Sequence, residues 1–277
     1  MRQNPLGINV MAGHGGTTVP EQIALLKAVG WDAFFTPWDP KHTELWANAG
    51  AKNGMIYTSI HAPFSMEHRI WIGGEEARTE VRRLIACAED CARYEIPVMV
   101  LHTINGFSER TPKMPTQVGL DYFGEIIEAG NRLGIRLAFE NTEREEFLQT
   151  VLDTYKDEPS IGFCFDSGHE FCYRNSDLLT RYGDLLVHTH LDDNFGVTGD
   201  EITWYDDSHL PLGDGSVDFT HVMERIDRIG YTGVLSCELT TKNKPQRNTH
   251  GAYVEMPLEE FYKLALDRVR RIVRGAS

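Results

Sequence analysis

The sequence predicts an α/β fold, a (β/α)8 TIM barrel formed as one domain over residues 1–277. Short apolar runs alternate with longer amphipathic runs from one end of the chain to the other, and eight such pairs fit its length. Several of the short runs are continuously apolar, as in parallel strands that are covered on both faces. No segment between the pairs has the composition of a linker, so the count and order of the pairs favour a single barrel.

The elements follow one another in regular order. Strands are expected at 6–10, 31–36, 55–61, 97–102, 135–140, 161–166, 185–191 and 233–239. Helices are expected at 19–30, within 37–53, and at 75–95, 116–134, 144–156, 176–183, 218–230 and 258–273. Gly30 and Gly134 close two of these helices, as glycine often does.

A glycine-rich segment, MAGHGGTT, follows the first strand at 11–18. It does not fit the GxGxxG pattern that a doubly wound nucleotide-binding sheet would need there. We therefore interpret it as a flexible active-site loop, which leaves the open sheet as the structural alternative.

The composition limits the function. The formal net charge is −14, with 41 acidic and 27 basic residues, which disfavours a nucleic-acid partner because such binding relies on Lys and Arg. The five cysteines form no CxxC pair, and Cys87 and Cys91 are spaced as core residues of a helix, so no disulfide framework is expected. No signal-like or membrane-spanning apolar stretch is apparent, and a cytoplasmic enzyme without a membrane partner is the expectation.

Metal-capable side chains recur at the ends of the predicted strands, and the carboxyl ends of barrel strands converge on the catalytic face. A carboxylate at the end of an apolar strand is costly to bury unless it is paired or bound to a metal. Mixed oxygen and imidazole ligands suit Mn, Zn, Co or Mg. We therefore predict a divalent metal site formed by Glu140, Asp166, His190 and Glu238.

The stretch from His188 to Gly215 is the densest in metal-capable groups. His188 and His190 alternate on one strand and point to the same face, with His188 one layer deeper as a supporting or packing residue. The Asp207-x-His209 unit that follows can fold back over that face, and the loop between is expected to shape the substrate pocket. The remaining histidines are expected on the surface or in loops: His14, His42, His68, His221 and His250.

Six motifs together resemble the xylose-isomerase-like barrel superfamily, which contains sugar isomerases and epimerases, dehydratases of inosose and dehydroshikimate, and endonuclease IV. They span essentially the whole chain: HAPF (61–64), FENT (139–142), FDSGH (165–169), HTHLDDN (188–194), DSHLPLGDGSVDF (207–219) and CEL (237–239). In epimerases of the family such a quartet holds one divalent metal. The resemblance implies Glu140 and Glu238 as a catalytic acid/base pair and His169 as a substrate contact.

The resemblance also raises the number of metal ions that the site could hold. The residue types of the nine ligands in the trinuclear zinc site of endonuclease IV are all matched here. The additional metal ligands so implied are His61, His102, His169, Asp207 and His209. One metal is the first expectation and three the upper limit.

One feature departs from the family's epimerases, which commonly have an arginine shortly after the histidine of the seventh strand. The run here is HLDDNFGVTGD, without arginine. Substrate recognition is therefore assigned to loop residues, and the candidates are Trp38, Trp71, Asn141, Glu146 and Trp204.

The resulting expectation is an isomerase or epimerase of carbohydrate metabolism, acting on a sugar, sugar phosphate or cyclitol by proton transfer through an enediolate. A lyase or dehydratase acting on a polyol or keto-acid is the alternative. An endonuclease-IV-like multi-zinc phosphoester hydrolase and a noncatalytic sugar-binding protein come after it. The expected partner is a small sugar or polyol, and a homo-oligomer is compatible with barrels of this kind.

Overall fold

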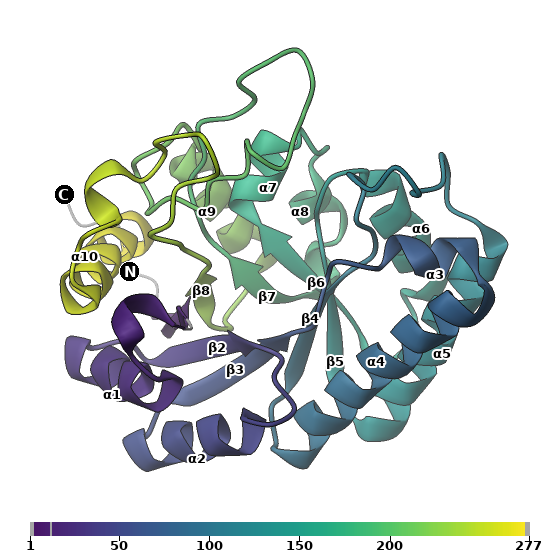
Figure 1. The fold of residues 1–277 in the computed structure, drawn as a ribbon, viewed down its shortest axis with the longest axis horizontal. Helices are drawn as coiled ribbons and strands as arrows, with labels where there is room; N and C mark the ends of the chain where they lie inside the picture. Colours follow the sequence, from purple (N-terminus) through teal and green to yellow (C-terminus); the bar gives the residue numbers. More distant parts are fainter. Residues whose placement is uncertain (1–2, 12, 275–277) are drawn as a thin grey trace.

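The computed structural model describes residues 3–11 and 13–274 and contains one sheet of eight parallel strands (Figure 1). The strand order is β7-β6-β5-β4-β3-β2-β1-β8. The ends of this order meet through a bridge between Leu191 and Cys237, so the sheet forms a nearly closed barrel. The strands are β1 (Leu6–Asn9), β2 (Ala33–Pro37), β3 (Ile56–His61), β4 (Val98–His102), β5 (Arg136–Glu140), β6 (Ile161–Asp166), β7 (Leu186–His190) and β8 (Leu235–Cys237). The predicted (β/α)8 fold is confirmed.

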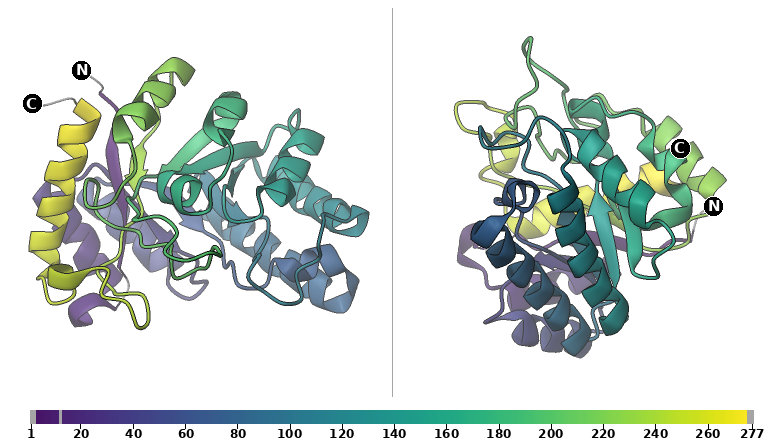
Figure 2. Two further views of the ribbon diagram at one scale, coloured as in Figure 1. Left: turned by 90° about the horizontal axis from the view of Figure 1, so that it is seen from above. Right: turned by 90° about the vertical axis from the view of Figure 1, so that its right-hand side faces the viewer.

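The helices lie outside the barrel (Figures 1 and 2). The longer ones are α1 (Val19–Val29), α2 (Thr43–Asn53), α4 (Gly74–Arg93), α5 (Gln117–Leu133), α6 (Glu145–Tyr155), α9 (Phe219–Ile229) and α10 (Leu258–Arg274). The short ones are α3 (His68–Ile72), α7 (Ser167–Cys172) and α8 (Leu178–Arg181), with the 3-10 turns η1 (His14–Gly16), η2 (Gly183–Leu185) and η3 (Gly251–Tyr253). In residues 3–11 and 13–274, no helix has both the length and the apolarity that a membrane crossing requires.

Local sequence explains where the longer helices begin and end. Thr18 and Glu21 form a capping box at the start of α1, and the left-handed Gly30, with φ of 107°, ends it. Thr116 and Asp218 cap α5 and α9 in the same way, by accepting a hydrogen bond from the backbone of the first turn. The helices α3 and α7 were not predicted because each is shorter than two turns, too short to show a hydrophobic period.

The barrel interior below the strand ends is filled by small side chains. Val98, Val100, Ala138 and Cys164 form a buried cluster of their own, separate from the larger core between the strands and the helices. Alternation along each strand puts these residues on the same face as the polar residues at the ends of β4, β5 and β6. The functional side chains therefore stand on a packed floor.

Two histidines expected on the surface or in loops are buried. His68 belongs to α3 and His250 to the segment before η3, and both are less than one-tenth exposed. For His68 the expectation is wrong, because α3 turns it towards the protein interior. The cysteines expected in the core, Cys87 and Cys91, are buried in α4.

The residue before α3, Glu67, is fully buried, and neither of its carboxylate oxygens has a hydrogen-bond partner in the described part of the chain. Burial, with a smaller contribution from the Glu80 carboxylate, raises the pKa of Glu67 to about 8 from an ordinary 4.5. The folded chain thus keeps a proton that the unfolded chain releases above about pH 4.5. Stability is consequently lost as the pH rises from about 4.5 to about 8.

We expect Glu67→Gln to remove this loss, because glutamine is neutral at every pH. The free energy of unfolding of the variant should be close to that of the parent near pH 5 and exceed it by roughly 4 kcal/mol near pH 8. Urea unfolding at the two pH values measures the difference. The matched control is Glu89→Gln on the exposed side of α4. A difference that stays constant with pH would contradict the assignment.

Candidate metal centre

The predicted quartet is brought together by strand register. His102 of β4 pairs with Glu140 of β5, and Asp166 of β6 pairs with His190 of β7, each at the carboxyl end of its strand. Glu238 follows β8, and a ligand atom from each of Glu140, Asp166, His190 and Glu238 lies within 4.8 Å of the others. The four carboxylate and imidazole groups thus form one cluster at the barrel mouth.

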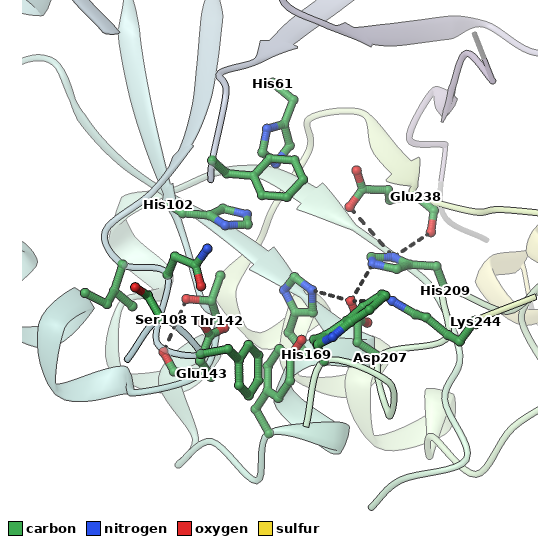
Figure 3. Close-up of a pocket in the computed structure, with 16 residues that line it drawn as sticks. His61, His102, Ser108, Thr142, Glu143, His169, Asp207, His209, Glu238 and Lys244 are labelled. Carbon is green, nitrogen blue, oxygen red and sulfur yellow. Dashed lines mark hydrogen bonds and ion pairs between the residues drawn. The ribbon is translucent and has the colours of Figure 1, made fainter. Parts of the chain in front are cut away.

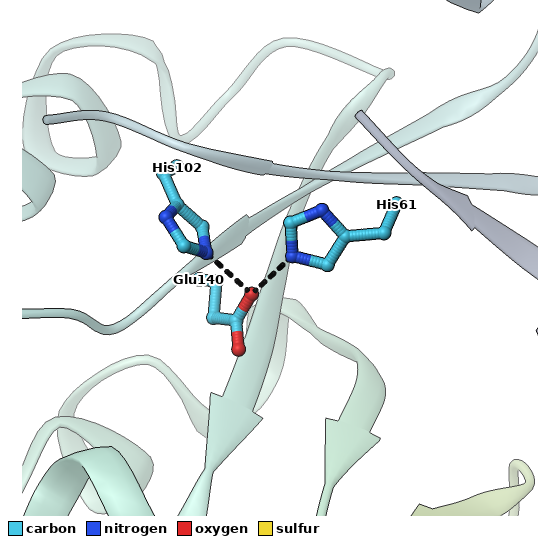
Figure 4. A group of neighbouring side chains, drawn as sticks. All are labelled: His61, His102 and Glu140. Atoms are coloured by element: carbon cyan, nitrogen blue, oxygen red, sulfur yellow. Dashed lines mark hydrogen bonds and ion pairs between the residues drawn. The ribbon is translucent and has the colours of Figure 1, made fainter. Parts of the chain in front are cut away.

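Glu140 is the central acceptor of this cluster. Its Oε2 lies 3.2 Å from His61 Nε2 and 3.1 Å from His102 Nε2 (Figure 4), and its Oε1 lies 2.8 Å from His190 Nδ1. Burial alone would raise the pKa of Glu140, but the charge of His190 and the hydrogen bonds from the three histidines hold that pKa well below its usual range. Glu140 is therefore ionised at neutral pH.

Two buried atoms of the quartet have no partner in the described part of the chain. They are Asp166 Oδ2 and His190 Nε2. Burial and the nearby Asp192 carboxylate raise the pKa of Asp166 well above its ordinary value, so its ionised form lacks a compensating charge. Buried polar atoms normally have partners, and a divalent cation would supply one to both atoms. The donor set and its unpaired atoms fit a metal.

The other five predicted ligands surround the quartet. His61 and His102 form one group with Glu140, and His169, Asp207 and His209 form another. Asp207 Oδ2 lies 2.9 Å from His209 Nε2 and 3.5 Å from His169 Nε2. His209 has a φ of 49°, a left-handed backbone uncommon for histidine and typical of functional positions. The structure therefore places all nine residues at one end of the barrel.

His188 lies one layer below this cluster. It is buried, its Nε2 lies 3.2 Å from the Ser59 hydroxyl, and its ring packs edge-on against that of His190 at 5.1 Å. These contacts support the His190 ring from beneath.

A further carboxylate, Asp192, was not predicted. It is buried, and its Oδ2 lies 2.9 Å from His209 Nδ1, while Oδ1 accepts a hydrogen bond from the Gly168 amide. The only sequence signal for Asp192 is its position two residues after His190. Its neighbour Asp193 has a different, structural role. Asp193 accepts from the amides of Gly213, Gly215 and Val217 and so shapes the LPLGDG turn.

The close approach of the Asp192 carboxylate requires a glycine at position 168. A Cβ at Gly168 would lie 2.1 Å from Asp192 Oδ1, well inside contact distance. We expect Gly168→Ala to displace the Asp192 carboxylate and to lower the free energy of unfolding by about 1–3 kcal/mol, although alanine otherwise favours a helix. Chemical denaturation measures this. Gly199→Ala is the control, because no atom lies within 4 Å of the added Cβ, and an equal loss in both variants would contradict the role of Asp192.

A cavity of about 610 Å³ opens above the cluster (Figure 3). Six predicted ligands reach it: His61, His102, His169, Asp207, His209 and Glu238. Its other lining residues are Phe64, Ile104, Asn105, Phe107, Ser108, Thr142, Glu143, Tyr173, Trp204 and Lys244. Most of these belong to loops after β3, β4, β5 and β7, where the sequence has no period from which they could be predicted.

Only some of the predicted substrate-binding residues line this cavity. His169 and Trp204 line it, whereas Trp38, Asn141 and Glu146 do not. The Trp38 indole donates to Asp90 of α4, and Glu146 pairs with Arg144. Trp71 is fully buried in the core.

Asn141 has a place beneath the site instead. Its Oδ1 accepts from the Asp166 amide at 2.7 Å, and its Nδ2 donates to the Asp166 carbonyl at 2.9 Å. The carbonyl of Asn141 also lies 2.9 Å from His169 Nδ1. These contacts fix the backbone of Asp166 and the orientation of the His169 ring.

Comparisons with known proteins agree with this architecture. The profile of a family described as "Xylose isomerase-like TIM barrel" matches residues 8–265. An uncharacterized protein of Methanocaldococcus jannaschii is 27% identical over 195 residues, which are 65% of this chain and 63% of that protein. The match thus spans less than two thirds of that relative's length.

Two solved structures are similar over nearly their whole length. The IolI protein with a bound zinc atom has a TM-score of 0.76 at 16% identity and covers 99% of both chains. The 3-keto-D-glucoside 4-epimerase YcjR of E. coli has a TM-score of 0.71 at 17% identity and covers 97% of this chain and 99% of its own. At these identities the two structures show a common fold.

Proposed function

Because the chain belongs to the xylose isomerase-like TIM barrel family, we propose that it is a divalent-metal-dependent isomerase or epimerase acting on a sugar, sugar phosphate or cyclitol. The observation that carries the proposal is the buried quartet of Glu140, Asp166, His190 and Glu238, with two unpartnered atoms, beneath a cavity that Glu238 reaches. The epimerase and the zinc-containing protein among the structural neighbours support it.

The quartet would hold the metal, which when bound stabilises negative charge on a substrate oxygen. Glu238 is placed to move the proton. Its side chain is 23% exposed and lines the cavity, and despite burial the charges of His190 and His209 lower its pKa, so it is an ionised base at neutral pH. His169, on the same cavity wall, is placed to contact a substrate hydroxyl.

Glu140 is the second carboxylate of the proposed acid/base pair. It lies three strands away from Glu238 around the barrel and is fully buried beneath His61 and His102. Epimerisation needs a proton to leave one face of a carbon and return to the other, and two carboxylates on different strands meet that need. Glu238 lines the cavity, whereas Glu140 would transfer its proton from beneath the cavity floor.

The test is proton exchange in D₂O. The metal-loaded protein is incubated with a panel of ketohexoses, ketopentoses, their phosphates, inososes and keto disaccharides, and deuterium incorporation next to the carbonyl is followed by NMR. Exchange with the carbon skeleton retained is the expected result. Loss of water with a new ultraviolet chromophore would replace the proposal with a dehydratase. No exchange with any member of the panel would count against both.

A further inference from the structure

The cavity is much larger than one sugar ring. A single hexose fills roughly 200 Å³ at the packing density of protein interiors, whereas the cavity measures about 610 Å³. The metal-binding groups occupy only part of its wall. A monosaccharide held against Glu238 and His169 would therefore leave most of the space unfilled.

The rest of the wall contains aromatic side chains that are not needed by the core. Phe64, Phe107 and Trp204 are 55%, 38% and 42% exposed, although large apolar side chains are usually buried. Phe107 packs against Tyr173 at 5.8 Å, and Tyr173 against the His169 ring at 5.1 Å. An aromatic surface thus leads from the metal-binding cluster outward along the cavity.

Four further hydrogen-bonding groups line the cavity, and those of Ser108, Thr142 and Glu143 lie on the side away from Glu238 (Figure 3). They are the Asn105 amide, the hydroxyls of Ser108 and Thr142, and the Glu143 carboxyl, which accepts from the Gly106 amide. Amides and hydroxyls both donate and accept, as sugar hydroxyls require. Glu143, the only carboxylate among them, belongs to none of the candidate metal-ligand groups of the described residues.

Lys244 fixes the position of Trp204 in this wall. Its ammonium group lies 4.9 Å from the centre of the Trp204 indole and 3.6 Å from Asp207 Oδ2. The cation therefore joins the aromatic side chain to the metal-binding cluster. Among the described residues that line the cavity, Lys244 is the only lysine or arginine.

Resting on the function proposed above, we propose that the substrate is a two-ring saccharide, a keto sugar linked to a second sugar ring. The reacting ring lies against His169 and Glu238. The second ring lies on the aromatic surface of Phe107, Tyr173 and Trp204, with its hydroxyls bound by the amide and hydroxyl groups beside it. Aromatic faces combined with a few convergent polar groups are the usual lining of small-molecule sites.

Binding of unreactive sugars tests this without depending on turnover. Isothermal titration calorimetry of the metal-loaded protein compares glucose with cellobiose, maltose, gentiobiose and trehalose. We expect at least one disaccharide to bind about tenfold more tightly than glucose. Phe107→Ala and Trp204→Ala should each remove most of that advantage.

The matched control is Phe195→Ala, which removes an aromatic side chain that is 49% exposed but does not line the cavity. It should retain the advantage, and thermal unfolding checks that all three variants are folded. The proposal is overturned if no disaccharide binds more tightly than glucose, or if the advantage survives both cavity variants.

The two proposals fail separately. Proton exchange with a keto monosaccharide, but no preference for any disaccharide, would overturn the two-ring substrate and leave the isomerase function intact. A disaccharide preference without proton exchange on any keto sugar would overturn the isomerase function and leave the two-ring saccharide site intact. The cavity would then be a saccharide site of another activity.

Discussion

Replacing Glu238 by glutamine is expected to lower kcat for proton exchange by about 10²–10⁴-fold, the usual contribution of a positioned acid or base. Glutamine has nearly the same size and keeps one oxygen towards the quartet, but it cannot accept the proton. KM should change much less than kcat, because the neighbouring His169 and His209 still line the cavity. Deuterium incorporation under saturating substrate measures kcat.

The matched control is Glu146→Gln. Glu146 has the same side chain, but it pairs with Arg144 outside the cavity, and its replacement should leave the exchange rate unchanged. Metal content is determined for both variants, so that a loss of metal is not mistaken for a loss of base. A Glu238→Gln protein that keeps its metal and more than half its exchange rate would exclude Glu238 as the base.

The fold could be predicted because a barrel of this kind repeats one signal eight times. Each strand was expected within a few residues of its observed bounds, since continuous apolar runs mark β4 (Val98–His102) and β6 (Ile161–Asp166) as clearly as turns mark their ends. The short helices α3 and α7 were missed. Their positions depend on contacts such as that of the Gly168 amide with Asp192, which is distant in sequence.

The clustering of the candidate metal ligands could be predicted for a related reason. A polar residue at the carboxyl end of an apolar strand lies at the catalytic face of a barrel, where all the strand ends converge. This rule brings Glu140 and Asp166 together. The cavity residues follow no such rule. Lys244 reaches the cavity from the segment after β8, where the sequence gives no sign that its side chain turns inward over Trp204.

Asn141 shows where reasoning from neighbourhood fails. Asn141 follows Glu140 directly and is one of the loop residues to which substrate recognition is assigned from the sequence. Alternation along the strand turns its side chain away from the cavity, and there it holds the backbone of Asp166. Trp38 does not line the cavity either, because its indole is directed towards α4, where it donates a hydrogen bond to Asp90.

Metal removal is expected to abolish proton exchange, and elemental analysis of protein purified without chelator should find one divalent metal per chain. The variants Asp166→Asn and Asp207→Asn then locate it. A metal at the quartet is lost in Asp166→Asn and kept in Asp207→Asn, because Asp207 belongs to the separate group with His169 and His209. Three metals in the parent, reduced in both variants, would instead support the nine-ligand site. No metal after careful handling would contradict both.

Stability adds a second, independent readout of the same site, because Asp166→Asn should act in opposite directions with and without metal. In the metal-free protein the Asp166 carboxyl is buried beside Asp192 with an unpartnered Oδ2, and its pKa is raised, so a neutral asparagine avoids the cost of burying the charge or of taking up a proton and should raise the melting temperature. The α7 cap survives, since asparagine can also accept from the His169 amide. With metal at 100 times its Kd, the parent should gain about 2.7 kcal/mol that the variant lacks. A variant whose melting temperature responds to metal as the parent's does would remove Asp166 from the site.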